Sequence, residues 1–366
     1  MPKKIKNCFY KNLTFVKLLE AHKRARNHKT YKEEVIKFEI NLENNLINLL
    51  NNIKNGKYHL GKYFEFKIYE PKERIIKALP YVDRVVHQWY VEEFIKPYIV
   101  PRFISTSFAC LDEKGTHRAA NNVQKQARIF KRNFGDFWIL KCDIKKFFYN
   151  IDPNILFKIL LKYMDDKALI SFTGLLIFEN KTDPSEVGIP IGNYTSQFFA
   201  NIYLNELDQF AKRTLKLKYY TRYMDDFIIL LKSKKECIEV KSKIEAFLNK
   251  TLHLTLNEKS RYYPYSMGVN FCGYRIFTTH KLLRTNSKKK IKKNVKSWNK
   301  AYKANSLDIP LTLQKINSWI GHASHCNSYN LEQKILNSCD FLYTDHTYNK
   351  IEQNLLEDIS LITNNK

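Results

Sequence analysis

The spacing of apolar residues changes from segment to segment, and it predicts the order of secondary-structure elements. Residues 32–56 carry apolar side chains near helical spacing and end at Gly56, which predicts a helix. Polar and apolar residues alternate over 62–86, which predicts a β-hairpin with Pro71 at a strand margin. A helix is expected over 83–99, beginning at Asp83.

Further along the chain, short β-rich runs alternate with helical segments. The run 137–143 predicts a buried strand that ends in Asp143, and 218–231 predicts two strands interrupted by Met-Asp-Asp. Helices are expected over 115–134, 153–178, 194–217, 236–251 and beyond 286, and a strand pair over 269–284. These elements favour an α+β fold with a helical, Lys-rich C-terminal part.

Composition narrows the functional class. Of 366 residues, 44% are hydrophobic and 14% aromatic, which excludes a disordered tail. The chain has no apolar run of about 18 residues and no apolar leader, so we expect neither a membrane span nor secretion. The seven scattered cysteines are expected to be reduced in a cytoplasm. The net charge of +26 predicts a polyanionic partner, nucleic acid ahead of lipid, although an AT-rich genome would also favour lysine.

Three carboxylates form the candidate chemical site. Asp225 and Asp226 are adjacent between two β runs, and Asp143 ends the buried strand. Adjacent anions repel unless a cation lies between them, so this set predicts two Mg²⁺ ions for phosphoryl transfer, with Mn²⁺ as a substitute. The alternative is a solvated turn. Tyr-Met-Asp-Asp also occurs at 163–166, where the sequence predicts only a helix end.

With these residues assembled, the chain resembles a reverse transcriptase of the group II intron-like superfamily. The segment YEPKERIIKALPYVDRVVH resembles the family's fingers, CDIKKFFYNID its motif A, YMDD at 223–226 its motif C, LTLNEKSR its motif D and FCGYRIF its primer grip. The resemblance implies a right-hand polymerase with an N-terminal helical extension (1–60), fingers (61–136), a palm (137–285) and a helical basic thumb with its tail (286–366).

The same resemblance implies roles for single residues. Lys72 and Arg74 would hold the triphosphate of the incoming dNTP, and the backbone carbonyl of Ile144 would join the three aspartates as a metal ligand. Phe148 would be the steric gate that selects dNTP over NTP. Lys259 would donate a proton to the leaving pyrophosphate, although lysine is so abundant here that this assignment has the weakest support.

Motif B narrows the resemblance to one group. The chain has Ile191, Gly192 and Gln197 in IGNYTSQ, where most reverse transcriptases have Gln-Gly-x-x-x-Ser-Pro. This pattern, with SWIGHASHCNSYNL at 318–331, resembles the reverse transcriptases of bacterial and phage diversity-generating retroelements. It implies a dNTP and template pocket at these residues, a template RNA, a cDNA product, adenine-directed errors and a small basic accessory protein. An Ile side chain beside the nascent base pair cannot form hydrogen bonds. Mispairs would therefore lose less binding energy relative to correct pairs than they would beside a Gln.

Other interpretations stay open. The same catalytic core could serve a bacterial antiviral-defence reverse transcriptase, and a catalytically inactive RNA-binding scaffold is a third alternative. His322, His325 and Cys326 suggest a metal site, but helix packing is favoured because no fourth ligand lies at zinc-like spacing. The Lys run after Asn286 is either a solvated helix face or a surface that neutralises the phosphates of a duplex.

Overall fold

The computed structural model describes residues 4–69, 73–179 and 186–342. The chain divides into two compact units. Unit 1 contains residues 1–119 and 134–264, and unit 2 contains residues 120–133 and 265–366. The division differs from the predicted domain limits, because residues 265–285, expected in the palm, cluster with the C-terminal helices. The names fingers, palm and thumb stay a prediction.

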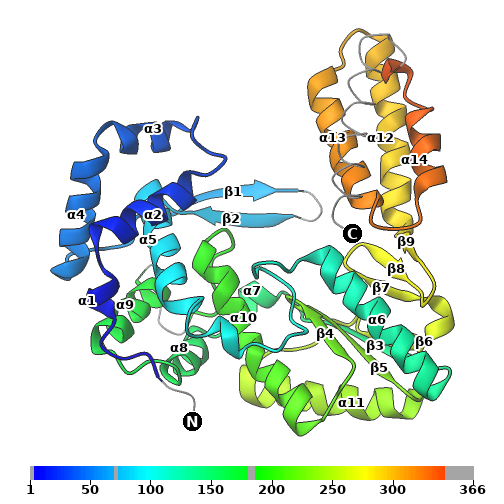
Figure 1. Cartoon of the computed structure of the whole chain (residues 1–366), viewed down its shortest axis with the longest axis horizontal. Helices are drawn as coiled ribbons and strands as arrows, with labels where there is room; N and C mark the ends of the chain where they lie inside the picture. The colour runs from blue at the N-terminus through cyan, green and yellow to red at the C-terminus, as the bar shows by residue number, and fades with distance from the viewer. Residues whose placement is uncertain (1–3, 70–72, 180–185, 343–366) are drawn as a thin grey trace. The chain divides into compact units, whose positions relative to one another are not determined.

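Unit 1 is built around a four-stranded antiparallel sheet in the order β4-β5-β3-β6. Its strands are β3 (Trp138–Asp143), β4 (Tyr220–Tyr223), β5 (Asp226–Leu231) and β6 (Arg261–Pro264). The central strand β5 is buried except at Asp226, and β3 combines buried and half-buried residues, as expected for strands inside a sheet. Helix α11 (Lys234–Phe247) packs on one face of the sheet (Figure 1). The sequence analysis missed β6.

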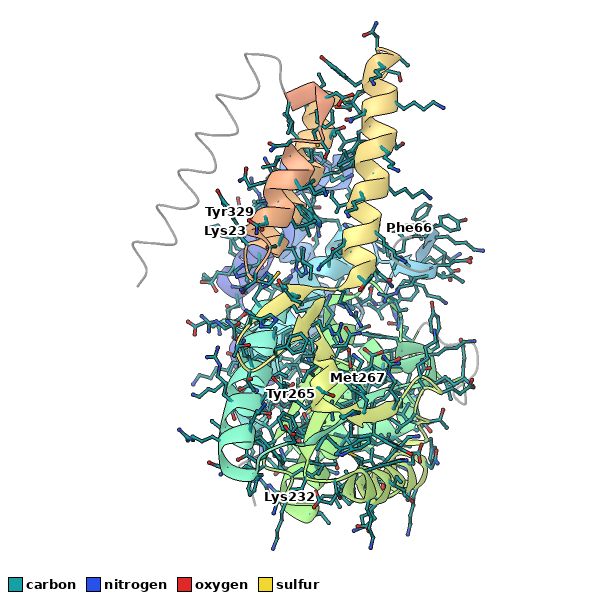
Figure 2. The ribbon with its side chains drawn as sticks, turned by 90° about the vertical axis from the view of Figure 1, so that its right-hand side faces the viewer. Lys23, Phe66, Lys232, Tyr265, Met267 and Tyr329 are labelled. Atoms are coloured by element: carbon teal, nitrogen blue, oxygen red, sulfur yellow. The ribbon has the colours of Figure 1, made fainter. Side chains whose placement is uncertain are left out.

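Unit 1 also contains a separate two-stranded antiparallel hairpin, β1 (Phe64–Ile68) with β2 (Arg74–Ala78), whose residues are largely exposed. Phe66 of β1 lies at the surface (Figure 2). Besides α11, the α-helices of unit 1 with at least eight residues are α2 (Phe15–Arg26), α3 (Glu33–Ile40), α4 (Leu42–Lys54), α5 (Tyr81–Tyr90), α8 (Pro153–Leu161), α9 (Lys167–Phe178) and α10 (Tyr194–Gln209). The short α1 (Phe9–Asn12) and α7 (Phe147–Asn150) complete the set, and α6 (Thr116–Phe134) spans the boundary between the units.

Three predicted helices differ from the observed ones. The helix over 32–56 is two helices, broken at Asn41, and the one over 153–178 is also two, α8 and α9. The helix predicted from Asp83 begins at Tyr81, and Asp83 is buried inside it. The Asp83 carboxylate, in the first turn of α5, accepts hydrogen bonds from the Tyr58 hydroxyl (2.6 Å) and the Gly61 N–H (3.0 Å), which compensate for its burial.

In its described residues, unit 2 contains most of α6, a three-stranded antiparallel sheet and three helices that follow the sheet. The sheet contains β7 (Val269–Phe271), β8 (Tyr274–Ile276) and β9 (Lys281–Leu283), where a strand pair was expected. A 3₁₀ turn, Tyr265–Met267, leads into it (Figure 2). Helices α12 (Thr285–Lys303), α13 (Ile309–Ala323) and α14 (Tyr329–Leu336) enclose a small apolar core that includes Ile291, Ile316 and Ile335.

His322 packs against the sheet of unit 2, as the helix-packing interpretation predicted. Its ring stacks on Tyr274 with centroids 4.6 Å apart, and its carbonyl accepts a hydrogen bond from the Tyr274 hydroxyl at 2.8 Å. All seven cysteines are free thiols. The α+β class is confirmed, and no helix in the described ranges combines the length and apolarity that a membrane span requires.

Candidate active site

The turn between β4 and β5 presents two of the three candidate aspartates. Tyr223 and Asp226 are opposite each other in the antiparallel register, so Met224 and Asp225 form a two-residue turn. Met224 has φ +53°, in the left-handed region. This conformation costs an L-residue about 1–2 kcal/mol, so the surrounding structure must hold the turn in place.

The third aspartate lies across the sheet from this turn. Asp143 is the last residue of β3 and faces Asp226, the first residue of β5, in the antiparallel register. Directly opposite residues in such a pair have Cα atoms about 4.5–5.5 Å apart. Residues distant in sequence therefore meet at one end of the sheet, although their role as metal ligands stays a prediction.

The carboxylates of the site repel one another. Burial raises the pKa of Asp225 to about 6, and the charges of Asp143 and Asp226 act in the same direction. Arg74 of β2 opposes this shift, so the field of the predicted triphosphate-binding residue reaches the turn. Arg74 itself is exposed, and the predicted Lys72 lies outside the described residues. The negative charge at this end of the sheet favours a bound cation.

A lysine already pairs with one of the carboxylates. Lys141 of β3 donates to Oδ2 of Asp226 at 2.7 Å. The Lys141 side chain is 15% exposed and the Asp226 side chain 29%, so the ion pair is partly shielded from water. The sequence analysis missed this residue. The signal was a lysine within an otherwise apolar buried strand, which requires a charged partner.

Asp143 is anchored by the segment that precedes β6. Asn257 donates from Nδ2 to Oδ2 of Asp143 at 3.0 Å and from its backbone N–H to the Asp143 carbonyl at 2.7 Å. The Ser260 hydroxyl accepts from the Asp143 N–H at 3.1 Å. The same segment contains Lys259, the proton donor that the family resemblance implies. Its side chain is exposed, and its N–H donates to Oδ1 of Asn257.

The donor chemistry fits a hard divalent cation. Among the residues that the structure describes, no group of three His, Cys, Asp or Glu side chains is close enough to hold an ion by itself. The three aspartates lie at one end of the sheet without forming a complete set of metal ligands, and their binding of two ions stays a prediction. Mg²⁺ in polymerase sites typically binds one or two carboxylates and completes its shell with substrate phosphates and water, so the carboxylates at this sheet end remain suitable ligands.

The remaining predicted pocket residues lie on two connected segments. The Phe148 carbonyl accepts from the Ile189 N–H at 2.9 Å, which joins motif A to the segment before α10. The Ile191 carbonyl accepts from the Lys77 N–H of β2, also at 2.9 Å. Ile144 is buried after β3, and Gln197 is exposed in the first helical turn of α10. The dNTP-binding roles of these residues stay predictions.

Gly192 is required where β2 approaches this segment. Its φ is +126°, and a Cβ there would lie 2.9 Å from the Lys77 carbonyl oxygen. Beside it is a cavity of about 300 Å³ lined by residues of the hairpin, α7 and α9, including Ile75, Lys77, Tyr149, Ile177 and Ile191. The close backbone contact explains why glycine follows Ile191.

The second Tyr-Met-Asp-Asp has a structural role. Asp166 caps α9 by accepting from the Leu169 N–H, and its other oxygen accepts from the N–H groups of Cys8 (2.7 Å) and Phe9 (2.9 Å). Asp165 is exposed and pairs with Lys6 at 3.0 Å. The tetrapeptide alone is therefore no indicator of chemistry, as expected from the sequence.

Comparisons with known proteins identify the family of the chain. Residues 69–276 match the family model described as reverse transcriptase (RNA-dependent DNA polymerase). Group II intron-encoded protein LtrA of Lactococcus lactis subsp. cremoris is 24% identical, over 64% of this chain and 50% of LtrA. Protein YkfC of Escherichia coli (strain K12) is also 24% identical, over 53% of this chain and 60% of YkfC. The chain thus spans about half the length of LtrA.

A solved structure of telomerase from Candida albicans, in complex with a fragment of telomeric RNA, is similar to this chain with a TM-score of 0.48. The sequences are 11% identical, and the match covers 66% of this chain and 51% of the telomerase chain.

Proposed function

The chain belongs to the reverse transcriptase family, and from this premise we propose that it is an RNA-directed DNA polymerase. It extends a primer along a template RNA with dNTPs. The observation that carries the proposal is the direct pairing of Asp143 with Asp226 beside the Asp225 turn. In this proposal the four-stranded sheet of unit 1 is the palm and the β1–β2 hairpin belongs to the fingers.

Each residue of the site has a distinct task in this proposal. Asp143, Asp225 and Asp226, with the carbonyl of Ile144, would hold two Mg²⁺ ions or Mn²⁺ in their place. When bound, such ions neutralise charge on the triphosphate and activate the primer hydroxyl. Members of the reverse transcriptase family generally use divalent cations. The anchoring of Asp143 by Asn257 and Ser260 fixes one ligand before substrate arrives.

The substrate is bound by residues around the carboxylates. Arg74 and Lys72 bind the triphosphate, Phe148 excludes a ribose 2′-hydroxyl, and Lys259 protonates the leaving pyrophosphate. The Arg74 charge already acts on Asp225, which supports its placement beside the triphosphate. Lys259 belongs to the segment that anchors Asp143, where its N–H donates to Oδ1 of Asn257.

Helix α12 supports a nucleic-acid partner. Ile291 and Val295 are buried on one face, with Trp298 and Tyr302 packed beside them. The lysines of this helix include 288, 289, 290, 292, 293, 296, 300 and 303. A surface of this charge can neutralise the phosphates of a template–primer duplex, whose affinity should therefore fall with salt.

For the biological role, we propose diversification of a target gene by adenine-mutated cDNA, in the cytoplasm of a bacterium and with a small basic accessory protein. Ile191 supports the mutagenic step, because its backbone is fixed by Lys77 while its side chain offers no hydrogen bond to a template base. Antiviral defence by the cDNA itself is the second candidate. The motifs separate the two roles poorly.

Primer extension on an RNA template tests the catalytic proposal. Asp225→Asn should abolish dNTP incorporation, because the amide cannot serve as an anionic ligand. Asp165→Asn is the matched control, since it changes the same position of the other Tyr-Met-Asp-Asp, where the carboxylate only pairs with Lys6. Extension that survives Asp225→Asn would refute the proposal. Loss of extension in both variants would show that the assay reports folding instead.

Sequencing of cDNA tests the biological role. The wild-type protein should misincorporate mainly opposite adenine, and Ile191→Gln should lower that error rate by about tenfold, the effect of about 1.4 kcal/mol of added discrimination. An unchanged adenine error rate would contradict the role of Ile191. Faithful cDNA from the wild-type protein, made in cells from a non-repeat template, would favour defence.

A further inference from the structure

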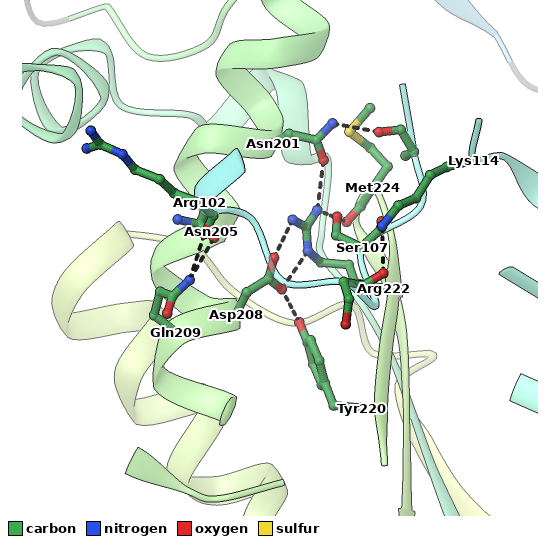
Figure 3. A network of polar contacts seen from close by, with 12 residues as sticks. Arg102, Ser107, Lys114, Asn201, Asn205, Asp208, Gln209, Tyr220, Arg222 and Met224 are labelled. Carbon is green, nitrogen blue, oxygen red and sulfur yellow. Dashed lines mark hydrogen bonds and ion pairs between the residues drawn. The ribbon is translucent and has the colours of Figure 1, made fainter. Parts of the chain in front are cut away.

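A buried arginine lies directly beside the Met224–Asp225 turn. Arg222 of β4 is 0% exposed, and its guanidinium forms a two-pronged pair with Asp208 of α10 (Figure 3). Nε donates to Oδ1 at 2.8 Å and Nη2 donates to Oδ2 at 2.6 Å. The Tyr220 hydroxyl donates to the same Oδ1 at 2.7 Å. The charge of Arg222 is thus balanced by Asp208.

The third guanidinium nitrogen reaches the turn itself. Nη1 of Arg222 donates to the Met224 carbonyl at 3.0 Å and to Oδ1 of Asn201 at 3.0 Å (Figure 3). Asn201 lies seven residues before Asp208 on the same face of α10, and its Nδ2 donates to the Ala109 carbonyl at 2.9 Å. Helix α10 therefore orients the guanidinium through two side chains.

The backbone of Arg222 is also fixed. Its N–H donates to the Thr106 carbonyl, and its carbonyl accepts from the Phe108 N–H, both at 3.0 Å. The segment around Ser107 thus pairs with the edge of β4 in a parallel bridge. Arg222 is held at both ends, so it can act as a rigid support.

The Met224 carbonyl belongs to the peptide that connects Met224 to Asp225. Its orientation therefore determines where the Cα of Asp225, and hence its carboxylate, is presented. The turn has reasons to relax, because Met224 is in the left-handed region and Asp225 is repelled by Asp143 and Asp226. A charged donor in a dry environment makes a stronger hydrogen bond than a neutral one, which opposes that relaxation.

We propose that Arg222 is a positioning residue that holds the Met224–Asp225 peptide in the orientation required for Asp225 to bind a divalent cation. This inference rests on the proposed function, since it concerns the same carboxylates. A purely structural Arg222 would contribute to stability without setting metal affinity. The two roles differ in a measurement of cation binding to correctly folded protein.

The test compares three variants of the full chain with the wild type. Arg222→Lys keeps the charge but loses the planar fork, and Asn201→Ala removes one acceptor of the same Nη1. Arg84→Lys is the matched control, because Arg84 also forms a fork with a carboxylate, Glu34, and donates to a backbone carbonyl, that of Leu79, outside the site. The measurements are thermal unfolding, Mn²⁺ binding by electron paramagnetic resonance, and primer extension over a range of MgCl₂.

Arg222→Lys should weaken Mn²⁺ binding by about 10- to 100-fold, the usual effect of losing a support of a metal ligand. It should lower kcat more than it raises KM for dNTP. Asn201→Ala should weaken Mn²⁺ binding and lower kcat by a few-fold each. Arg84→Lys should match the wild type in both measurements. If Arg222→Lys does not fold, Asn201→Ala decides the question.

The inference is overturned if the folded Arg222 and Asn201 variants bind Mn²⁺ and respond to MgCl₂ as Arg84→Lys does. A wild-type chain that binds Mn²⁺ but extends no primer would refute the proposed function, while the Mn²⁺ measurements would still decide the role of Arg222. A wild-type chain that binds no Mn²⁺ would refute both.

Discussion

Asp143 and Asp226 are direct cross-strand partners, the last residue of β3 opposite the first residue of β5. Antiparallel pairing puts both at the same end of the sheet, and the two-residue turn adds Asp225 beside them. The sheet register thus determines the spacing of the carboxylates. A one-residue slip of β5 would turn Asp226 to the opposite face. The site and the core of unit 1 therefore depend on the same strand pairing.

Neutralising Asp225 should stabilise the protein while destroying its activity. The pKa of this carboxyl is about 6 in the folded chain, against an ordinary value of 3.8. Folding therefore becomes less favourable as pH rises from 3.8 to 6, and the full penalty, about 3 kcal/mol, applies above pH 6. Asp225→Asn removes this penalty. Urea unfolding in EDTA at pH 8 should give a larger free energy of unfolding for the variant.

Asp165→Asn is again the control for this measurement. Asp165 is exposed, and the Lys6 ammonium lowers the pKa of its carboxyl. Asp165→Asn should therefore not increase the free energy of unfolding. The gain from Asp225→Asn should shrink as pH falls from 6 and disappear below 3.8, where Asp225 is protonated in the folded and the unfolded chain alike. An Asp225→Asn protein no more stable than the wild type at pH 8 would show that the carboxylate is not under electrostatic strain.

Removing the ammonium of Lys141 should tighten cation binding. Lys141 occupies Oδ2 of Asp226 at 2.7 Å, where a divalent cation would compete with it. Lys141→Met keeps the apolar stem and removes the charge. We expect Mn²⁺ binding to strengthen by about three- to tenfold, equivalent to about 0.7–1.4 kcal/mol. Lys241→Met, which breaks the Lys241–Glu245 pair on α11, should change nothing. Weaker binding by Lys141→Met would instead make the lysine part of the cation site.

Much of the fold of unit 1 could be predicted from periodicity. The run 137–143 is the central strand β3, and the split run 218–231 is the edge strand β4 followed by the central strand β5; buried strands read as continuous apolar segments. The segment at β6, Arg261–Pro264, shows no comparable run, since it is a short edge strand that ends in proline. Asp166 of the second Tyr-Met-Asp-Asp starts α9 through a side-chain cap, and Asn41 separates α3 from α4 without one; a 3.6-residue period reveals neither break.

The site was predictable as far as it depended on strand ends. Asp143, Asp225 and Asp226 come together as the pattern indicated, whereas Asn257 and Ser260 act through hydrogen bonds that only the tertiary structure creates. The burial of Arg222 could also have been predicted from the sequence. A charged residue in the run before Tyr-Met-Asp-Asp must be buried with a partner, but nothing in the sequence identified Asp208 as that partner.

Truncating Phe148 should relax sugar selection. The side chain is partly buried against Phe147, with ring centroids 5.6 Å apart, and its carbonyl is bonded to Ile189. If its ring is the steric gate, Phe148→Ala should raise kcat/KM for NTP relative to dNTP by about 10- to 100-fold. Single-nucleotide extension with matched NTP and dNTP pairs measures this ratio.

Phe147 provides the control for the gate. It is 2% exposed, so Phe147→Ala should cost about 3–5 kcal/mol of stability through a core cavity and leave the NTP:dNTP ratio unchanged. A ratio that changes in Phe147→Ala but not in Phe148→Ala would assign selection to core packing.

Acid should destabilise unit 1 through His87. This histidine of α5 is buried, with Nδ1 2.9 Å from the Thr195 hydroxyl of α10, and burial lowers its pKa to about 3. The unfolded chain binds a proton near pH 6.5, but the folded chain does not until about pH 3, so stability is complete above 6.5 and falls as pH decreases toward 3. The loss between pH 7 and 5 should be about 2 kcal/mol.

His87→Asn isolates this contribution, because the amide can hydrogen-bond to Thr195 and does not titrate. Urea unfolding at pH 7 and pH 5 should show a decrease for the variant that is smaller by about 2 kcal/mol than for the wild type. His28→Asn is the control, since His28 is exposed and its positive φ suits asparagine. It should keep the wild-type dependence on pH. Equal decreases in His87→Asn and wild type would mean that the acid-sensitive group lies elsewhere, and that α5 and α10 stay packed when His87 is protonated.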